Sequence, residues 1–208
     1  MARIITPEAI LSYPQLFEPK AASKNAEPKY SACLVFPEGS DLFELQAAYV
    51  EAAKAKWGDK AGKVIRAMEH PTFRSDPDDV AAKGYPVGST FLNPRTTRKP
   101  SIVSIYPDPA TGKPMPVTDE ALVYPGVIVK ASLEPYTYDR EKVGVTFGLG
   151  NIQIIRDGER LDGRAAATDE FDSDMGAVAD LSDLTDEDFP DTVNQMAAGE
   201  DDLSDLFN

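Results

Sequence analysis

The sequence predicts a β-rich domain of the all-β or α+β class, either a small barrel or a sandwich, followed by an acidic C-terminal tail. At least five segments alternate large and small or polar residues and are rich in β-branched and aromatic residues, which is typical of strands. One region, residues 41–68, has helical spacing and follows the second predicted strand. Strands and helices do not alternate along the chain, which argues against a parallel α/β sheet.

The acidic residues are distributed unevenly and define the tail. The chain holds 35 acidic and 21 basic residues, and residues 165–208 contain fourteen of the acids and no Lys or Arg. Residues 1–164 are therefore neutral, and the whole net charge of −14 lies in the tail. A block of like charges does not collapse onto itself, so we expect a disordered tail after a folded domain that spans residues 1–164.

The tail also carries a repeated motif. Asp180-Leu-Ser-Asp-Leu184 recurs as Asp202-Leu-Ser-Asp-Leu206, and a Phe follows each copy, Phe189 and Phe207. A solubilising low-complexity tail would explain the charge, whereas apolar anchors at matched positions favour a peptide that docks on partner proteins. The candidate docking residues are Asp202, Leu203, Asp205, Leu206 and Phe207.

The domain is expected to begin with two strands. Ala9–Phe17 forms the first, and Pro14 confines part of it to an edge or a bulge. A polar connection over 18–27 leads to the second strand, Tyr30–Phe36, which alternates regularly between two prolines.

The helical region comes next. Asp41 and Glu44 have the spacing of a capping box, and Gly58 is a plausible C-cap. A weaker second helix is expected over residues 61–68. Bases are dense here, and they form either the solvent face of a helix or a contact for DNA; the candidates are Lys54, Lys56, Trp57 and Lys60.

Residues 69–87 contain three prolines and are predicted to form one long loop, which includes the candidates Phe73 and Arg74. Two strands are then expected, 89–93 and 101–106, joined as a hairpin by residues 94–100. The tip of that hairpin would carry three bases and no acid, flanked by two aromatic rings, as a contact for a phosphate backbone. These candidates are Phe91, Arg95, Arg98, Lys99 and Tyr106.

The end of the domain is predicted to be strand-rich. Residues 122–133 form a strand, and Tyr136 and Tyr138 share one face if it continues past a proline at 135. In the next strand, 143–154, large residues switch from odd to even positions, which requires a bulge near Gly148 and Gly150. A turn at 157–158 and a short last strand at 159–161 complete the domain.

The sequence offers little for catalysis. Cys33 and His70 are the only residues of their types, so there is no disulfide framework and no thiol cluster for zinc. Carboxylates at 76–79, or Asp172 and Asp174 in the tail, could bind a divalent cation, but the tail pair would lack fixed geometry. We therefore expect no enzyme activity, no catalytic residue, no metal site and no cofactor.

Single-strand binders combine a basic groove with aromatic platforms, and the body contains both ingredients. Any one aromatic here could instead be a core residue. The predicted DNA-binding residues are Lys54, Lys56, Trp57, Lys60, Phe73, Arg74, Phe91, Arg95, Arg98, Lys99, Tyr106, Tyr136, Tyr138 and Arg140.

Several motifs in order resemble one family. They are Pro28-Lys-Tyr-Ser-Ala-Cys-Leu-Val-Phe36, Tyr124-Pro-Gly-Val-Ile-Val129, Gly144-Val-Thr-Phe-Gly-Leu149 and Ile152-Gln-Ile-Ile-Arg-Asp-Gly-Glu159. They resemble the bacteriophage single-stranded-DNA-binding proteins with an OB-fold core, and the likeness covers about residues 5–175. The resemblance implies an OB-fold-like five-stranded barrel with a helical insertion, and sequence-tolerant binding of single-stranded DNA. It also implies a role in phage DNA replication or recombination, with a tail that recruits replication proteins such as DNA polymerase or helicase.

Two rival hypotheses remain open. One is a DNA-mimic or partner-docking protein that acts mainly through its tail, and the other is a metal-dependent nuclease. A homodimer is compatible with the sequence. The chain lacks an apolar run of the length of a signal peptide or a membrane span, so we expect it in the cytoplasm of an infected bacterial cell and away from membranes.

Overall fold

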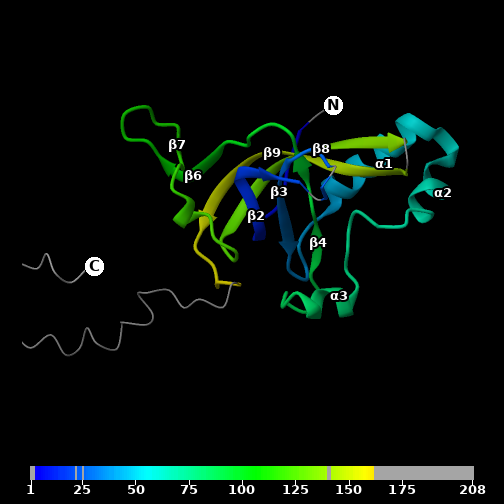
Figure 1. Cartoon of the computed structure of the whole chain (residues 1–208), viewed down its shortest axis with the longest axis horizontal. Helices are drawn as coiled ribbons and strands as arrows, with labels where there is room; N and C mark the ends of the chain where they lie inside the picture. Colours follow the sequence, from blue (N-terminus) through cyan, green and yellow to red (C-terminus); the bar gives the residue numbers. More distant parts are fainter. Residues whose placement is uncertain (1–2, 22, 25, 140–141, 162–208) are drawn as a thin grey trace, which may run out of the picture. The chain divides into compact units, whose positions relative to one another are not determined.

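The computed structural model describes residues 3–21, 23–24, 26–139 and 142–161 (Figure 1). The predicted tail, including its docking residues, and Arg140 lie outside the described residues. In the described part, nine strands form one sheet. Their bounds are β1 Ile4–Ile5, β2 Ala9–Lys20, β3 Lys29–Phe36, β4 Thr90–Leu92, β5 Arg95–Thr96, β6 Ile102–Pro107, β7 Pro114–Pro116, β8 Ile128–Asp139 and β9 Val143–Arg156.

Five of these strands close into a ring. The order is β2-β3-β5-β9-β8, and β8 returns to β2 through the pairs Ala9–Val129 and Ile10–Ile128. Every neighbouring pair in the ring is antiparallel except β5 and β9, which are parallel. This closed five-stranded barrel is an OB-like fold. The predicted barrel is therefore confirmed, and the sandwich is wrong.

β3 is the most buried strand of the ring. The segment Ala32–Phe36 is buried at every position. Ala32, Leu34 and Phe36 belong to the main core, whereas Cys33 and Val35 pack in a second, smaller cluster outside the ring with Val80, Tyr85 and Phe91. Alternate residues of this strand therefore pack in two different apolar clusters. Because both faces of the strand are buried, its register is fixed.

The helical insertion covers one side of the ring (Figure 1) and comprises α1 Phe43–Trp57, η1 Gly58–Lys60 and α2 Ala61–Arg66. Leu45, Tyr49, Ala52 and Ala53 are buried in the core. Gly58 ends α1 with a φ of 52°, as predicted for a C-cap. The predicted capping box is wrong. The helix begins after Leu42 without a side-chain cap, although the Asp41 carboxylate accepts a hydrogen bond from the Phe43 N–H at 3.0 Å.

The long loop predicted for residues 69–87 contains a helix instead, α3 Pro77–Ala82. Asp76 caps it, because its carboxylate accepts hydrogen bonds from the N–H groups of Asp78 and Asp79 at 3.0 and 3.2 Å. Pro77 lies in the first turn, where its missing N–H needs no partner. Pro77 thus marks the start of a helix where the sequence predicts a loop, and the acidic residues of this segment form the N-terminus of α3.

Residues 94–100 do not form a hairpin tip, so that prediction is wrong. β4 pairs with β3, whereas β6 runs parallel to β9 and antiparallel to β7. Between them, β5 joins β3 to β9. The hairpin in this part of the chain is β6–β7, and its turn is held by the Asp108 carboxylate, which accepts the Ala110 N–H at 2.7 Å.

β8 and β9 form a long antiparallel arm that extends beyond the ring beside α1 and α2 (Figure 1). The predicted bulge is confirmed. Ala131 pairs with Ile152 and Leu133 with Leu149, so β9 contains one extra residue between these pairs. Ser132 stabilises the bulge, since its Oγ accepts the Asn151 N–H at 2.7 Å. The strand expected at 159–161 is absent, and this segment instead packs on the 124–126 loop, with the Leu161 N–H donating to the Pro125 carbonyl at 2.9 Å.

None of the described helices is long and apolar enough to cross a membrane. The remaining short helix, η2 Glu120–Leu122, is capped by the Asp119 carboxylate, which accepts the Ala121 N–H at 2.9 Å.

Candidate nucleic-acid interface

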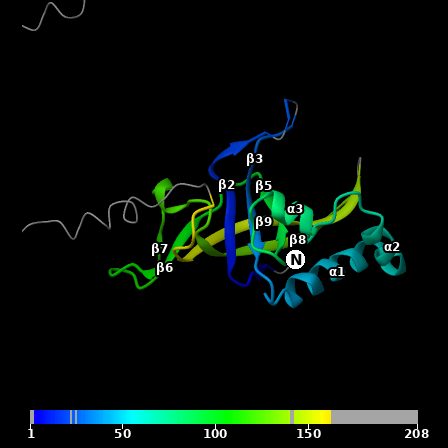
Figure 2. The ribbon, with the colours of Figure 1, turned by 90° about the horizontal axis from the view of Figure 1, so that it is seen from below.

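A groove of about 1180 Å³ lies between two arms of the barrel. One wall is the β2–β3 hairpin, which stands away from the ring, and the other is the β8–β9 arm, which projects in a different direction (Figure 2). Residues of β3 and β5 form the floor between the walls. We call this the first groove. In an OB fold, oligonucleotides bind to this face between these loops.

The first groove is basic. Four cationic side chains line it, and Glu27 is the one carboxylate among the lining residues. Glu27 lies 4.0 Å from the Lys29 Nζ in a solvent-exposed pair, which neutralises little of the local charge. The groove therefore has a net positive lining although residues 1–164 are neutral. Its cations are Lys20, Lys29, Arg74 and Arg95.

Tyr13 presents an aromatic ring to the first groove from the β2 wall. The strand is irregular between Ser12 and Gln15, as its Pro14 predicted, and Tyr13 has a φ of 44°. A non-glycine residue in this left-handed region is strained, and such strain is often found at functional sites. The ring is 62% exposed, and the Lys83 Nζ lies 5.9 Å from its centroid. The bulge thus holds an exposed ring next to a cation.

Tyr136 and Tyr138 present two more rings from the opposite wall. They lie on the same outer face of β8, as predicted, because the strand continues past Pro135. Tyr136 is 41% exposed. Burial of its hydroxyl raises the pKa of Tyr136, Tyr138 raises it further, and Arg95 opposes both effects, so the phenol stays neutral near pH 7. A neutral ring beside a guanidinium suits stacking on a base next to a phosphate.

Gly144 gives Tyr138 its place on the arm. A Cβ at Gly144 would lie 2.7 Å from Tyr138 Cζ and 2.9 Å from Met68 Cε, so a side chain here would have to displace the Tyr138 ring or the end of Met68. Met68 in turn lies 3.2 Å from the Tyr49 hydroxyl through its Sδ. The helical insertion and the arm are therefore packed together beneath the wall of the groove.

Two of the predicted DNA-binding aromatics are core residues. Phe91 is fully buried and packs edge-on against Tyr85 at 5.4 Å between ring centroids. Phe73 is half-buried and lies 5.5 Å from Tyr49 and 5.8 Å from Phe147. Phe91 is therefore inaccessible to a base in this structure, and Phe73 packs on two other rings of the protein.

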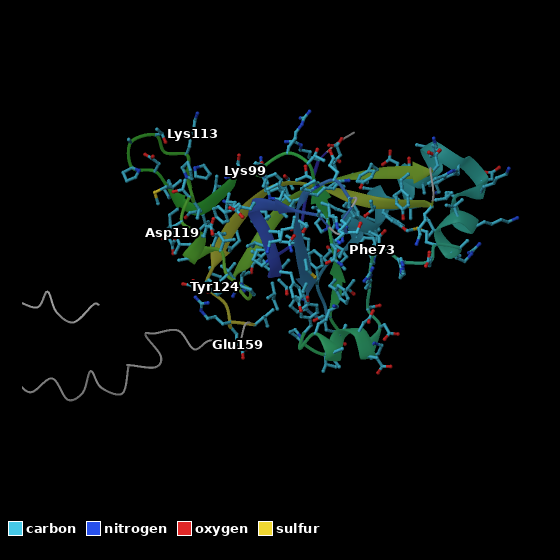
Figure 3. All side chains as sticks on the ribbon, in the orientation of Figure 1. Phe73, Lys99, Lys113, Asp119, Tyr124 and Glu159 are labelled. Carbon is cyan, nitrogen blue, oxygen red and sulfur yellow. The ribbon has the colours of Figure 1, made fainter. Side chains whose placement is uncertain are left out.

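The helix candidates lie outside the first groove. Lys54, Lys56 and Lys60 are exposed on α1 and η1, and Lys56 pairs with Asp139 at 2.8 Å. Trp57 is half-buried against the core. Tyr106 is 69% exposed on β6, on the side of the barrel away from Phe73 and the helices, where Lys113 marks the β6–β7 turn (Figure 3). The structure therefore separates these residues from the groove that contains Arg74, Arg95, Tyr136 and Tyr138.

Arg98 and Lys99 line a second groove of about 430 Å³ with Arg3. Sequence reasoning missed Tyr13, Lys20 and Lys29, which the β2–β3 hairpin brings to the first groove. The bulge proline and the polar connection after β2 were visible signals, but no local pattern indicates that this hairpin faces the β8–β9 arm.

The comparisons with known proteins agree on one family. The model of the family described as Enterobacter phage Enc34, ssDNA-binding protein, matches residues 2–183. Protein p50 of Acyrthosiphon pisum secondary endosymbiont phage 1 is 30% identical over 169 residues, which cover 78% of this chain and 88% of that protein.

Solved structures show the same fold. The single-stranded DNA-binding protein from bacteriophage Enc34 in complex with ssDNA is similar with a TM-score of 0.59 and 18% identity, over 76% of this chain and 88% of that one. A second solved structure of the single-stranded DNA-binding protein from bacteriophage Enc34 is similar with a TM-score of 0.58 and 17% identity, over 81% of this chain and 89% of that one.

Proposed function

The chain belongs to the family of the Enterobacter phage Enc34 ssDNA-binding protein, a non-enzymatic family, and on that premise we propose that it binds single-stranded DNA in the first groove with little regard to base sequence. In this role it supports phage DNA replication and recombination in the cytoplasm of the infected bacterium.

The observation that carries the proposal is the composition of the first groove. Three tyrosines, Tyr13, Tyr136 and Tyr138, line the same groove as its four cations. Stacking tolerates every base because every base has a π-face, and cations that contact phosphates carry no sequence information. A groove built from these two groups is therefore suited to hold a single strand of any sequence.

Binding of this kind depends strongly on salt, which gives the first test. Each phosphate neutralised on a single strand contributes about −0.7 to the slope of log K against log[salt]. Four groove cations predict a slope of about −3 for a labelled oligo(dT) of about 5 nucleotides, measured by fluorescence anisotropy. A matched oligonucleotide of mixed sequence should give nearly the same affinity. A slope near zero, or strong discrimination between the two oligonucleotides, would contradict the proposal.

We propose a division of labour between residues 1–164 and 165–208, which rests on the sequence. The acidic tail docks replication proteins such as DNA polymerase or helicase through Leu203, Leu206 and Phe207, and its charges compete with DNA for the basic groove. The repeated Asp-Leu-Ser-Asp-Leu motif supports docking, and the fourteen acids support competition.

A further inference from the structure

A second groove, distinct from the first, lies next to it on the barrel. Its floor is the β9 backbone at Gly148–Asn151, one wall is the β8 segment Ser132–Glu134, and the other is the connection 96–100. The bulge of β9 lies in this floor. Two of the four floor residues are glycines, so no side chain covers the backbone at these positions. From this arrangement we propose that a single strand bound in the first groove continues into the second groove, where Arg3, Arg98 and Lys99 bind its phosphates.

The charges of the second groove fit a phosphate backbone. Arg3, Arg98 and Lys99 face one lining carboxylate, Glu134. No ion pair joins any of these three cations to another residue in the part of the chain that the structure describes. Arg98 and Lys99 are exposed, and the Lys99 Nζ lies 5.9 Å from the centroid of the half-buried Phe17 ring. The cations are thus accessible to a polyanion.

The two grooves meet at two places. Thr96 and Thr97 line both grooves, so the boundary between the grooves is formed by these two small side chains. Arg95 lines the first groove and Arg98 lines the second. They are three residues apart, and three residues of extended chain span at most about 11 Å. One short stretch of DNA can therefore contact both side chains.

Gly148 provides the second meeting place. It belongs to the floor of the second groove, yet a Cβ built on it would lie 3.8 Å from Cδ1 of Tyr136, which lines the first. The other near atom is the Glu134 carbonyl oxygen at 3.6 Å, so the position has ordinary room for a side chain. A larger residue here would narrow the passage beside Tyr136 without changing any charge.

The proposal rests on the proposed function and predicts a length effect. OB folds bind about 4–16 nucleotides, so labelled oligo(dT) of about 5 nucleotides should fill the first groove only, and one of about 15 should reach both. Arg98→Ala combined with Lys99→Ala should leave the affinity for the short strand unchanged. It should weaken binding of the long strand roughly tenfold and reduce its salt slope by about 1.4.

Two further variants sharpen the test. Gly148→Val should weaken binding of the long strand and leave its salt slope unchanged, since no cation is lost. Lys63→Ala combined with Arg66→Ala removes the same charge from α2, outside both grooves, and should affect neither length. Circular dichroism would verify that each variant is folded.

The outcomes separate this inference from the proposed function. If the wild-type protein binds neither oligonucleotide, both are wrong. Suppose that the wild-type protein binds both oligonucleotides. If the Arg98–Lys99 variant then binds both lengths as tightly as wild type, or binds both more weakly by the same factor, the continuation into the second groove is wrong, and the proposal for the first groove is unaffected. A loss in the α2 control equal to that in the Arg98–Lys99 variant would also overturn the second groove, because general charge would then explain the effect.

Discussion

At the scale of single residues, exposed rings in the first groove differ from equally exposed rings elsewhere. Tyr136 and Tyr13 line the groove, whereas Tyr106 is 69% exposed but lines neither groove. We therefore expect DNA contact to follow a ring's position relative to the cations rather than its exposure alone, because a stacked base has its phosphate nearby, where a positive charge would stabilise it.

This difference gives a matched test of stacking. Tyr136→Ala and Tyr13→Ala should each weaken oligo(dT) binding by about 1–3 kcal/mol. Tyr106→Ala removes a comparable exposed ring and should leave the affinity unchanged. Anisotropy titrations of the three variants would measure the effect. If Tyr106→Ala weakens binding as much as the other two, the stacking rings have been assigned to the wrong side of the barrel.

At the scale of elements, the bulge in β9 sets the register of the arm that forms one wall of the groove. Gly150 lies at the bulge, and a Cβ there would lie 2.8 Å from the Ser132 carbonyl oxygen. Gly148, two residues earlier, has no such neighbour, since the nearest atom would be 3.6 Å away. The bulge therefore requires glycine at position 150 for steric reasons, but not at position 148.

The pair predicts unequal effects on stability. Gly150→Ala should lower the free energy of unfolding by about 1–3 kcal/mol, because the backbone must shift to admit the methyl group. Gly148→Ala should change it by less than about 1 kcal/mol. Urea denaturation followed by circular dichroism would compare them. Equal stability of the two variants would mean that the bulge tolerates a side chain and does not fix the register.

Elements with a local cause could be predicted from the sequence. The regular alternation of β3, the helical face of α1 with its terminal glycine, and the switch from odd to even positions in β9 all depend on neighbouring residues, and the structure confirms them. Elements with a long-range cause could not. The connection 94–100 has the turn residues of a hairpin, but β9, some fifty residues away, pairs with both β5 and β6 and so makes it a crossover.

The same distinction applies to the site. Tyr136 and Tyr138 could be found because they share a face of one strand, and Arg95 because it lies in an acid-free cluster. The burial of Phe91 could not be predicted, since it depends on tertiary contacts with Tyr85. Tyr13 could not be predicted as a groove residue, because its position there depends on the β2–β3 hairpin facing the β8–β9 arm.

At the scale of the whole molecule, the chain combines a basic groove with a tail of fourteen acids. We propose that the tail competes with DNA for the groove, because its composition predicts a flexible segment, and a flexible tether would give it an effective concentration of about millimolar. DNA would then have to displace it, and the competition should be strongest at low salt, where screening is weakest.

Deletion of residues 165–208 should therefore tighten binding to oligo(dT), and the gain should shrink as salt increases. Phe207→Ala, which keeps every charge, should retain wild-type DNA affinity and lose binding to replication proteins, measured by pull-down from infected cells. Equal DNA affinity of the full-length and truncated proteins at low salt would contradict the competition.

We propose that the first groove, and not the basic helices, holds the DNA. Two triple variants distinguish these sites: Lys20→Ala, Lys29→Ala, Arg95→Ala in the groove, and Lys54→Ala, Lys60→Ala, Lys63→Ala, which removes the same charge from the helical insertion. Salt-dependent anisotropy titrations with oligo(dT) should show a slope reduced by about 2 and weaker binding for the groove variant, and near wild-type values for the helix variant. The reverse pattern would place the DNA on the helices and not in the first groove.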